Sequence, residues 1–346
     1  MAKTEILFLK LFLHEGCFTY ILVTMKKIFI YLLCFFISWN LSFAEPATAV
    51  YTGEDYSIYV TYSESVQPGD PLCVRLDFTP SKTTRKEPDG LTQAVLLFGE
   101  KRKTDFFVLD GKNDKNDSLS LCGMIPLSTY QETGTHDITI MYSAYGREFM
   151  KFTLPISIEP KEFISETLEL DNRNTSIKTD TSSTRMRQID KLNEILYTIN
   201  TDSVFQKEPF EAPTTATRRT SFFGDRRIYS YVTGGSSTSL HYGIDYGIPT
   251  GSEVTACGAG RVVMAEDRIS SGLSIVVEHM PGLYSLYYHL DSFNVRVGQM
   301  VETGDLIGLS GATGLATGPH LHWEVRLNGE AVNPDFFTEK GFLYFK

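Results

Sequence analysis

Gly314-Leu-Ala-Thr-Gly-Pro-His-Leu-His-Trp-Glu-Val325 is the stretch that decides the fold of the C-terminal part of this chain. Two of the chain's seven histidines, His320 and His322, flank a single leucine here. Alternate residues of a β-strand point to the same face, so a strand at this place would direct both imidazoles to one side. A glycine-rich loop comes directly before them, and such loops commonly wall a binding groove. The stretch therefore predicts a strand that carries two histidines at the edge of a groove.

The region around this stretch, from residue 217 to residue 346, has the same character. It contains five of the seven histidines, and glycine-rich segments separate its strand-like runs. Those runs are rich in β-branched and aromatic residues, which is typical of strands. We therefore predict a mostly antiparallel β domain over residues 217–346, with strands near 261–265, 273–278, 284–289 and 321–327.

A further histidine and a carboxylate lie upstream in the segment His241-Tyr-Gly-Ile-Asp245. Two imidazoles and one carboxylate suit Zn²⁺, whose catalytic sites combine three protein ligands with an open position for water. The bound metal lowers the pKa of that water to about 7 and polarises a carbonyl group. With His289 the domain offers more groups than three ligands require, and the others can orient water, move protons or stabilise an oxyanion. The residues alone do not assign these roles, and a cluster of hydrogen bonds without a metal is the alternative.

Five segments of the domain resemble the lysostaphin-type (LytM-like) zinc metalloendopeptidases, bacterial enzymes that cut the peptide cross-links of peptidoglycan. Their order and spacing agree over about the last 125 residues of the chain. The resemblance implies the antiparallel β peptidase fold of that family, with its duplicated hybrid motif, and one Zn²⁺ per chain. The segments are Ser221-Phe-Phe-Gly-Asp-Arg-Arg227, His241-Tyr-Gly-Ile-Asp245, Tyr287-Tyr-His-Leu290, Gly304-Asp-Leu-Ile-Gly308 and Thr317-Gly-Pro-His-Leu-His-Trp-Glu324.

The same resemblance assigns the site residues. It implies that the zinc ligands are His241, Asp245 and His322, and that the catalytic pair is His289 and His320. It also places three residues near the segment that lines the family's substrate groove, namely Arg227, Tyr229 and Tyr231. His279, at the boundary between a strand and a turn, is expected to be structural.

The N-terminal half of the chain predicts a separate β domain over residues 51–160. It contains about seven short runs with period-two alternation, divided by Gly, Pro and Asp turns. We interpret it as an immunoglobulin-like β-sandwich, although no tryptophan lies between Cys73 and Cys122, so the antibody hallmark is missing. In an oxidising compartment these two cysteines are plausible disulfide partners.

Residues 161–216 form a linker whose composition shifts to Ser, Thr, Asn and Asp. Within it one apolar stripe at helical spacing predicts an amphipathic helix that docks on a neighbouring surface. The stripe consists of Met186, Ile189, Leu192, Leu196 and Ile199. An upstream segment that covers the groove or supplies a fourth ligand, through Asp171, Asn172 or Asn174, is an alternative that the sequence leaves open.

The first 44 residues have the pattern of a targeting segment. Met25-Lys26-Lys27 supplies a positive start, residues 28–39 are an apolar run, and Ser42-Phe43-Ala44 ends in small residues that a signal peptidase reads. We expect Met25 to be the true start. The pattern predicts export to the periplasm or cell envelope.

Charge and composition limit the functions that this chain can have. It is 42% hydrophobic and has a net charge of -10, so it is globular and lacks the basic patches that bind nucleic acid. We predict an exported zinc endopeptidase that acts on peptidoglycan peptides, with cell-envelope proteins as possible partners of the sandwich. The alternatives are a non-catalytic adaptor that activates another cell-wall hydrolase and a secreted protease that acts on proteins.

Overall fold

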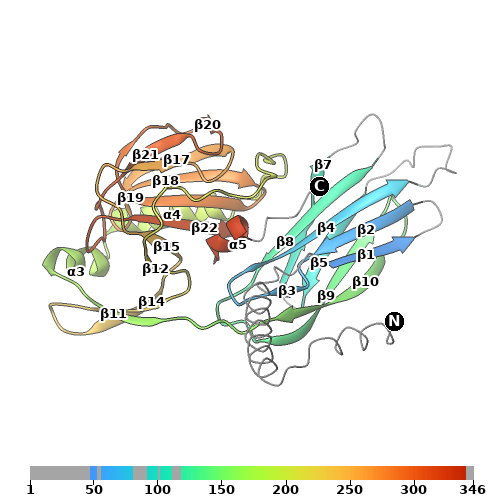
Figure 1. Ribbon diagram of the computed structural model, residues 1–346, viewed down its shortest axis with the longest axis horizontal. Helices are drawn as coiled ribbons and strands as arrows, with labels where there is room; N and C mark the ends of the chain where they lie inside the picture. The colour runs from blue at the N-terminus through green and yellow to red at the C-terminus, as the bar shows by residue number, and fades with distance from the viewer. Residues whose placement is uncertain (1–46, 53–55, 81–91, 100–101, 111–117, 340–346) are drawn as a thin grey trace, which may run out of the picture. The chain divides into compact units, whose positions relative to one another are not determined.

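The computed structural model describes residues 47–52, 56–80, 92–99, 102–110 and 118–339. Within these residues the chain is mainly β, as the sequence predicts, and Figure 1 shows its strands and helices. The predicted targeting segment, residues 1–44, lies outside the described residues. None of the helices in the described part is long and apolar enough to cross a membrane.

Two five-stranded sheets make up the N-terminal domain. Along strand β2, residues alternate between buried and more exposed positions, as expected for a sheet with one face in a core. Tyr56 and Phe78 of one sheet each contact Tyr142 of the other, with ring centroids 6.5 and 6.0 Å apart, so the two sheets pack face to face. This agrees with the predicted β-sandwich, while its immunoglobulin-like type stays a prediction. The first sheet has the order β1 (Ala47–Thr52), β2 (Tyr56–Tyr62), β4 (Pro71–Pro80), β8 (Leu119–Pro126) and β7 (Phe107–Asp110), and the second β3 (Ser65–Val66), β10 (Met150–Ile158), β9 (Gly134–Ser143), β5 (Gln93–Phe98) and β6 (Arg102–Asp105).

The predicted disulfide is not formed in the structure, where Cys73 and Cys122 are buried free thiols. They lie on neighbouring strands β4 and β8, but Cys73 is opposite Met124 and Cys122 is opposite Arg75. The two cysteines are therefore diagonal neighbours, and diagonal positions on an antiparallel pair are about 7 to 8 Å apart. A disulfide needs Cβ atoms only about 4 Å apart, so the register explains the difference from the prediction.

The linker folds into strand β11 (Ser165–Glu169) and helices α3 (Asn172–Thr179) and α4 (Ser183–Leu196). Helix α4 begins where the side chain of Ser182 accepts a hydrogen bond from the amide of Arg185. Its end packs against the peptidase sheet through Leu196, with Leu192 and Ile195 beside it, and the buried partners are Met264, Val276, Tyr284, Leu286 and Tyr288.

The predicted apolar stripe is therefore correct at Leu192 and Leu196 and wrong at its two ends. Met186 and Ile199 are both exposed. Ile199 lies beyond the last residue of α4, so it leaves the helical stripe. Near Met186 the helix contacts the sheet through polar groups, because Gln188 accepts a hydrogen bond from the amide of Ile269.

The C-terminal domain is built on one ten-stranded sheet whose pairs are all antiparallel, which confirms the predicted architecture. Its strands β15, β18 and β22 are buried almost throughout. The path through the sheet is β12 (Arg219–Ser221), β15 (Gly243–Tyr246), β22 (Leu321–Leu327), β19 (Leu283–Phe293), β18 (Gly272–Met280), β17 (Gly260–Arg268) and β20 (Met300–Val301), with β16 (Glu253–Thr255), β21 (Leu306–Ser310) and β23 (Glu330–Val332) beside it.

A second, three-stranded sheet joins the linker to this domain. It has the order β11, β13 (Arg226–Ser230) and β14 (Ser236–Leu240), and β11 runs parallel to β13. Strand β11 lies in the segment that was expected to be a linker with one helix. The chain closes with the short helix α5 (Pro334–Glu339).

Candidate metal centre

Two neighbouring strands of the large sheet hold the predicted metal ligands. On β15 and β22, Asp245 lies directly opposite His322, and His241 comes just before β15. The two strands approach closely at Gly243, where an added Cβ would lie 2.2 Å from the carbonyl oxygen of Trp323. Only glycine fits there, so the glycine in His241-Tyr-Gly-Ile-Asp245 allows β15 to pair this closely with β22.

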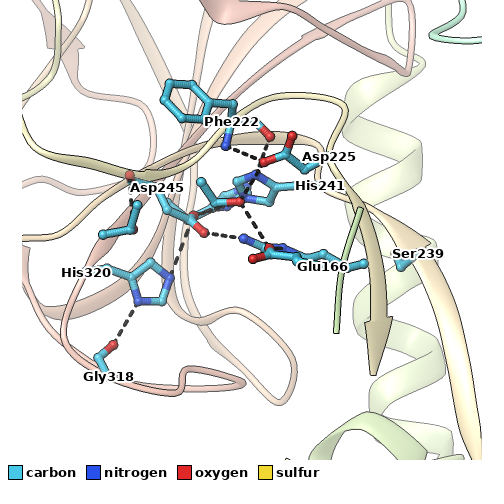
Figure 2. A network of polar contacts seen from close by, with 12 residues as sticks. Glu166, Phe222, Asp225, Ser239, His241, Asp245, Gly318 and His320 are labelled. Carbon is cyan, nitrogen blue, oxygen red and sulfur yellow. Dashed lines mark hydrogen bonds and ion pairs between the residues drawn. The ribbon is translucent and has the colours of Figure 1, made fainter. Parts of the chain in front are cut away.

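Three ligand atoms converge at this place. His241 Nε2 lies 3.1 Å from Asp245 Oδ1 and 3.0 Å from His322 Nδ1, and His322 Nδ1 lies 2.9 Å from Asp245 Oδ1. All three residues are buried, and their ligand atoms lie close enough together to hold a metal ion. Figure 2 shows the side chains of His241 and Asp245 turned toward each other.

The remaining ring nitrogens of the two histidines have other partners. His241 Nδ1 lies 2.8 Å from the carbonyl oxygen of Phe222, and His322 Nε2 lies 3.2 Å from Glu324 Oε2. Hydrogens donated to these oxygens leave a lone pair on each nitrogen that faces Asp245. Two lone pairs and a carboxylate about 3 Å apart repel one another unless a positive charge lies among them, so the donor set fits a cation such as Zn²⁺.

The electrostatics of the cluster agree with that requirement. Burial would raise the pKa of Asp245, but His241 and His322 hold it well below its usual range. Burial lowers the pKa of His241. Burial also acts to lower the pKa of His322, but hydrogen bonds to Asp245 and Glu324 outweigh it and raise the pKa to about 9. Asp245 is therefore an anion, and the positive charge beside it can come from a proton or from a metal ion.

Arg227 and Glu166 complete the carboxylate's surroundings. Arg227 Nη2 donates to Asp245 Oδ2 over 2.7 Å, and its Nε donates to Glu166 Oε1 over 2.9 Å. Burial acts to lower the pKa of Arg227, and the charge of Asp245 outweighs it, so the pKa is raised. Glu166 lies opposite Arg227 in the parallel pair of β11 and β13. Figure 2 shows how Glu166 reaches the site from the linker.

The predicted catalytic pair lies beside the ligands. The rings of His289 and His320 have centroids 4.6 Å apart, and His320 Nε2 lies 3.8 Å from Asp245 Oδ1. Their Nδ1 atoms lie 2.8 Å from the carbonyl oxygens of Thr313 and Gly318 respectively. Burial lowers the pKa of both rings, that of His289 to about 3. Both are neutral at pH 7, and each keeps a free lone pair on Nε2 when Nδ1 carries the hydrogen.

His289 also has an unusual backbone conformation. Its φ is 62°, in the left-handed region that non-glycine residues seldom adopt. Its amide donates to the carbonyl of Ser271, and the pairing of β18 with β19 shifts register beside it. Such backbone strain is found at functional sites, where surrounding contacts hold a side chain in place.

A cleft of about 510 Å³ is lined by the three predicted ligands and by the predicted catalytic pair, His289 and His320. Arg227 and Tyr229 line it, as predicted, but Tyr231 is not among its lining residues, and the Tyr231 hydroxyl donates to Ser237 Oγ instead. Arg227 and Tyr229 are alternate residues of β13, so they lie on the same face of the strand. Tyr231 lies beyond the end of β13, where this alternation no longer holds.

The linker contributes to this cleft differently from the alternative stated above. Asp171 caps helix α3, and the amide group of Asn174 donates to the carbonyl of Ala316, so neither approaches the ligands as a donor. Three linker residues line the cleft, Glu166, Leu168 and Leu170, and Glu166 contacts Arg227. Neither Glu166 nor Glu324 was predicted from the sequence, although the position of Glu324 two residues after His322 on a strand was a usable signal.

His279 is structural, as predicted. It is buried, its Nδ1 lies 2.7 Å from the carbonyl oxygen of Ala259, and its Nε2 lies 2.7 Å from Ser285 Oγ. It does not line the cleft.

Comparisons with known proteins place this site in a family. Residues 239–334, which contain four of the five sequence segments, match peptidase family M23, and this confirms the resemblance to that family. DD-carboxypeptidase/endopeptidase Mpg of Neisseria meningitidis is 42% identical over 95 residues, which are 28% of this chain and 22% of that protein. Peptidoglycan DD-endopeptidase ShyA of Vibrio cholerae is 36% identical over 140 residues, which are 40% of this chain and 31% of that protein.

Solved structures include a further similar protein. The catalytic domain of the antimicrobial peptidase lysostaphin from Staphylococcus simulans is 32% identical, and the match covers 35% of this chain and 90% of that chain with a TM-score of 0.29. The matched part of the present chain spans only 22% and 31% of the length of the two curated relatives named above.

Proposed function

Residues 239–334 belong to peptidase family M23, and on this premise we propose that the chain is a zinc-dependent endopeptidase that hydrolyses peptide cross-links of bacterial peptidoglycan. The observation that carries the proposal is the convergence of His241 Nε2, Asp245 Oδ1 and His322 Nδ1 within about 3 Å of one another. The printed functions of the relatives, a peptidoglycan DD-endopeptidase among them, support the choice of substrate.

The chain's own residues divide the work at this site. His241, Asp245 and His322 would hold the ion, and Glu324 with the Phe222 carbonyl would orient the two imidazoles. Zinc bound there supplies a Lewis acid for the scissile carbonyl and lowers the pKa of a bound water to about 7. Arg227 would keep Asp245 ionised and fixed through its second oxygen.

His289 and His320 would perform the proton transfers. Their Nδ1 hydrogens are donated to carbonyl oxygens, so each Nε2 can accept a proton from the attacking water. A ring that has been protonated at Nε2 can then donate to the developing oxyanion or to the leaving amine. The cleft that contains both rings is large enough to admit a peptide strand.

The adaptor hypothesis is less well supported than the enzyme. A binding module needs no set of convergent ligand atoms, whereas all five positions that the resemblance assigns are filled here and lie together. We also propose that residues 1–44 direct export, that residues 51–160, 161–216 and 217–346 are the sandwich, linker and peptidase domains, and that the protein acts in the periplasm or cell envelope.

The test is digestion of purified peptidoglycan sacculi with the protein that follows the leader. We expect cross-linked muropeptides to be converted to monomers, a chelator to stop the reaction and added zinc to restore it, with products identified by mass spectrometry. Sacculi left unchanged in the presence of zinc would support the adaptor, and cleavage of an unrelated unfolded protein at a similar rate would support a general protease.

A further inference from the structure

Arg268 is a buried cation in the wall of the cleft. It is the last residue of β17, it is only 7% exposed, and it lines the cleft together with Ser270, Ser271 and Leu315. Nothing in the sequence pattern or in the proposed mechanism requires a guanidinium at this place.

Arg268 has no carboxylate partner among the described residues. Its Nη1 donates to Ser271 Oγ over 2.9 Å and its Nη2 donates to the carbonyl of Gln188 over 3.2 Å, while its buried Nε has no hydrogen-bond partner there. Both of these acceptors are neutral. Burying a charge is costly unless an opposite charge compensates it, so an anion bound here would be stabilised by a charge that the described residues do not pair.

Two other arginines of the cleft wall have acidic partners. Arg227 is paired with Asp245 and Glu166, and Arg326 is paired with Glu324. Arg218 also lines the cleft but is exposed to solvent, whereas Arg268 is buried.

Arg268 lies one side chain away from the reacting groups. Arg268 and Tyr288 both line the cleft. The ring of Tyr288 stacks on that of the metal ligand His322, with centroids 5.3 Å apart and planes at 6°. On the other side, Ser271 accepts from Arg268 and its carbonyl accepts from the amide of His289.

The linker holds Arg268 in position. Gln188 of helix α4 donates to the carbonyl of Asp267, accepts from the amide of Ile269, and accepts from Arg268 itself through its own carbonyl. The guanidinium is thereby oriented before any ligand arrives, which reduces the entropy lost on binding.

We infer that Arg268 is the centre of a carboxylate-binding subsite, and that the cleft selects peptides with a free carboxylate close to the bond that is cut. A guanidinium binds a carboxylate through parallel, charge-assisted hydrogen bonds, and a buried one discriminates strongly against an uncharged group. A cross-link between acidic stem peptides meets this requirement, whereas a bridge made only of glycine does not. The inference rests on the proposed function for the identity of the reaction, but not for the binding preference.

The first experiment compares two synthetic cross-linked stem peptides that differ only in their acidic residues, which are free carboxylates in one and primary amides in the other. We expect the wild-type protein to prefer the carboxylate peptide by roughly 10- to 100-fold in kcat/KM, mostly through KM. Equilibrium binding of both peptides, measured by calorimetry, gives the same preference without turnover.

The second experiment uses variants of the arginine. Arg268→Gln should abolish the preference, so that the two peptides are bound and cleaved about equally, while Arg268→Lys should keep part of the preference. Arg187→Gln is the matched control, because Arg187 is exposed on the same helix that holds Arg268 and does not line the cleft. Zinc content and thermal unfolding show whether each variant is folded.

The outcomes separate this inference from the proposed function. Equal cleavage and equal binding of the two peptides by the wild-type protein would overturn the subsite and leave the endopeptidase standing. Selective binding of the carboxylate peptide without cleavage of either would support the subsite and count against the endopeptidase. Equal slowing of both peptides by a folded Arg268→Gln would show that Arg268 is only structural, and if that variant does not fold, the wild-type preference decides.

Discussion

His320 and His322 flank one leucine, yet the structure gives the two rings different surroundings. His322 Nδ1 lies within about 3 Å of both other ligand atoms. His320 Nε2 lies 3.8 Å from Asp245 Oδ1, and its Nδ1 faces the carbonyl of Gly318. The two surroundings fit the proposed roles, in which His322 holds the metal and His320 moves a proton beside it.

This difference predicts opposite behaviour of the two alanine variants. His322→Ala should lose zinc and activity together, because only two ligands remain. His320→Ala should keep nearly one zinc per chain and lose about 10²- to 10³-fold in rate, the usual cost of removing one group that stabilises a transition state. Metal analysis of both purified variants, with a peptidase assay, is the measurement. An empty His320→Ala protein beside a loaded His322→Ala protein would reverse the assignment.

Glu324 gives a second prediction at this scale. Its Oε2 lies 3.2 Å from His322 Nε2 and its Oε1 accepts from Arg326, so it orients the imidazole of this proposed ligand. Glu324→Gln should weaken zinc binding about 10- to 100-fold with little change in shape. Competition with a chelator measures the affinity, and the exposed Glu330→Gln is the control. Equal affinities for the two variants would show that the carboxylate does not support the ligand.

The residues of the site were predictable from sequence to different degrees. His241, Asp245, His289, His320 and His322 belong to motifs with their own spacing, and the structure brings all five together. Glu166 belongs to no such motif, because only the parallel pairing of β11 with β13 carries it to Arg227. Arg268 could not be predicted for a similar reason, because its lack of an acidic partner is a property of the folded protein.

Among the elements, strand β18 carries a buried histidine whose protonation opposes folding. Burial lowers the pKa of His279 from 6.5 to about 4. Between these values the unfolded chain binds a proton that the folded chain does not, so the stabilisation is complete above about pH 6.5 and is lost as the pH falls through 4. The full decrease in the free energy of unfolding is about 3 kcal/mol, from 1.36 kcal/mol per pKa unit.

The prediction is that His279→Gln flattens the pH dependence of stability. The amide can replace both hydrogen bonds, to the Ala259 carbonyl and to Ser285 Oγ, without acquiring a charge. Urea unfolding of both proteins in a chelator, at several pH values from 7 to 4, gives the two slopes. Parallel curves for the wild-type protein and the variant would mean that His279 does not take up the proton.

At this scale the sequence predicted strands better than it predicted their partners. The alternating runs of the sandwich and the buried runs of the peptidase sheet became strands, because periodicity is a local signal. Strand β11 was missed because its five residues are exposed at alternate positions and pair with a strand much further along the chain. Register was also beyond the sequence, which is why Cys73 and Cys122 were expected to form a disulfide and are diagonal neighbours instead.

For the whole molecule, the linker packs against the peptidase domain through one strand and one helix. Strand β11 extends the sheet of β13 and β14, and Glu166 on it holds Arg227. Helix α4 covers an apolar face of the large sheet, where Leu192, Ile195 and Leu196 contact buried residues. Composition predicted a boundary at residue 216, because residues 161–216 have the polar composition of a linker. The apolar residues that pack against the sheet are too few to change that composition.

Two fragments test whether the peptidase unit includes the linker. The fragment that begins at Lys161 keeps β11 and α4, whereas the fragment that begins at Thr217 exposes the sheet face that Leu196 covers and frees Arg227 from Glu166. Burying a leucine or isoleucine side chain contributes about 1.5 to 3 kcal/mol, so loss of this contact should lower stability by several kcal/mol. We expect the shorter fragment to melt at a lower temperature and to cleave the peptide more slowly.

In the longer fragment, Leu196→Ala removes part of the same contact and should give an intermediate melting temperature, at a cost of about 2 to 5 kcal/mol. A shorter fragment that melts with the longer one and cleaves faster would mean that the linker restrains the site instead of building it.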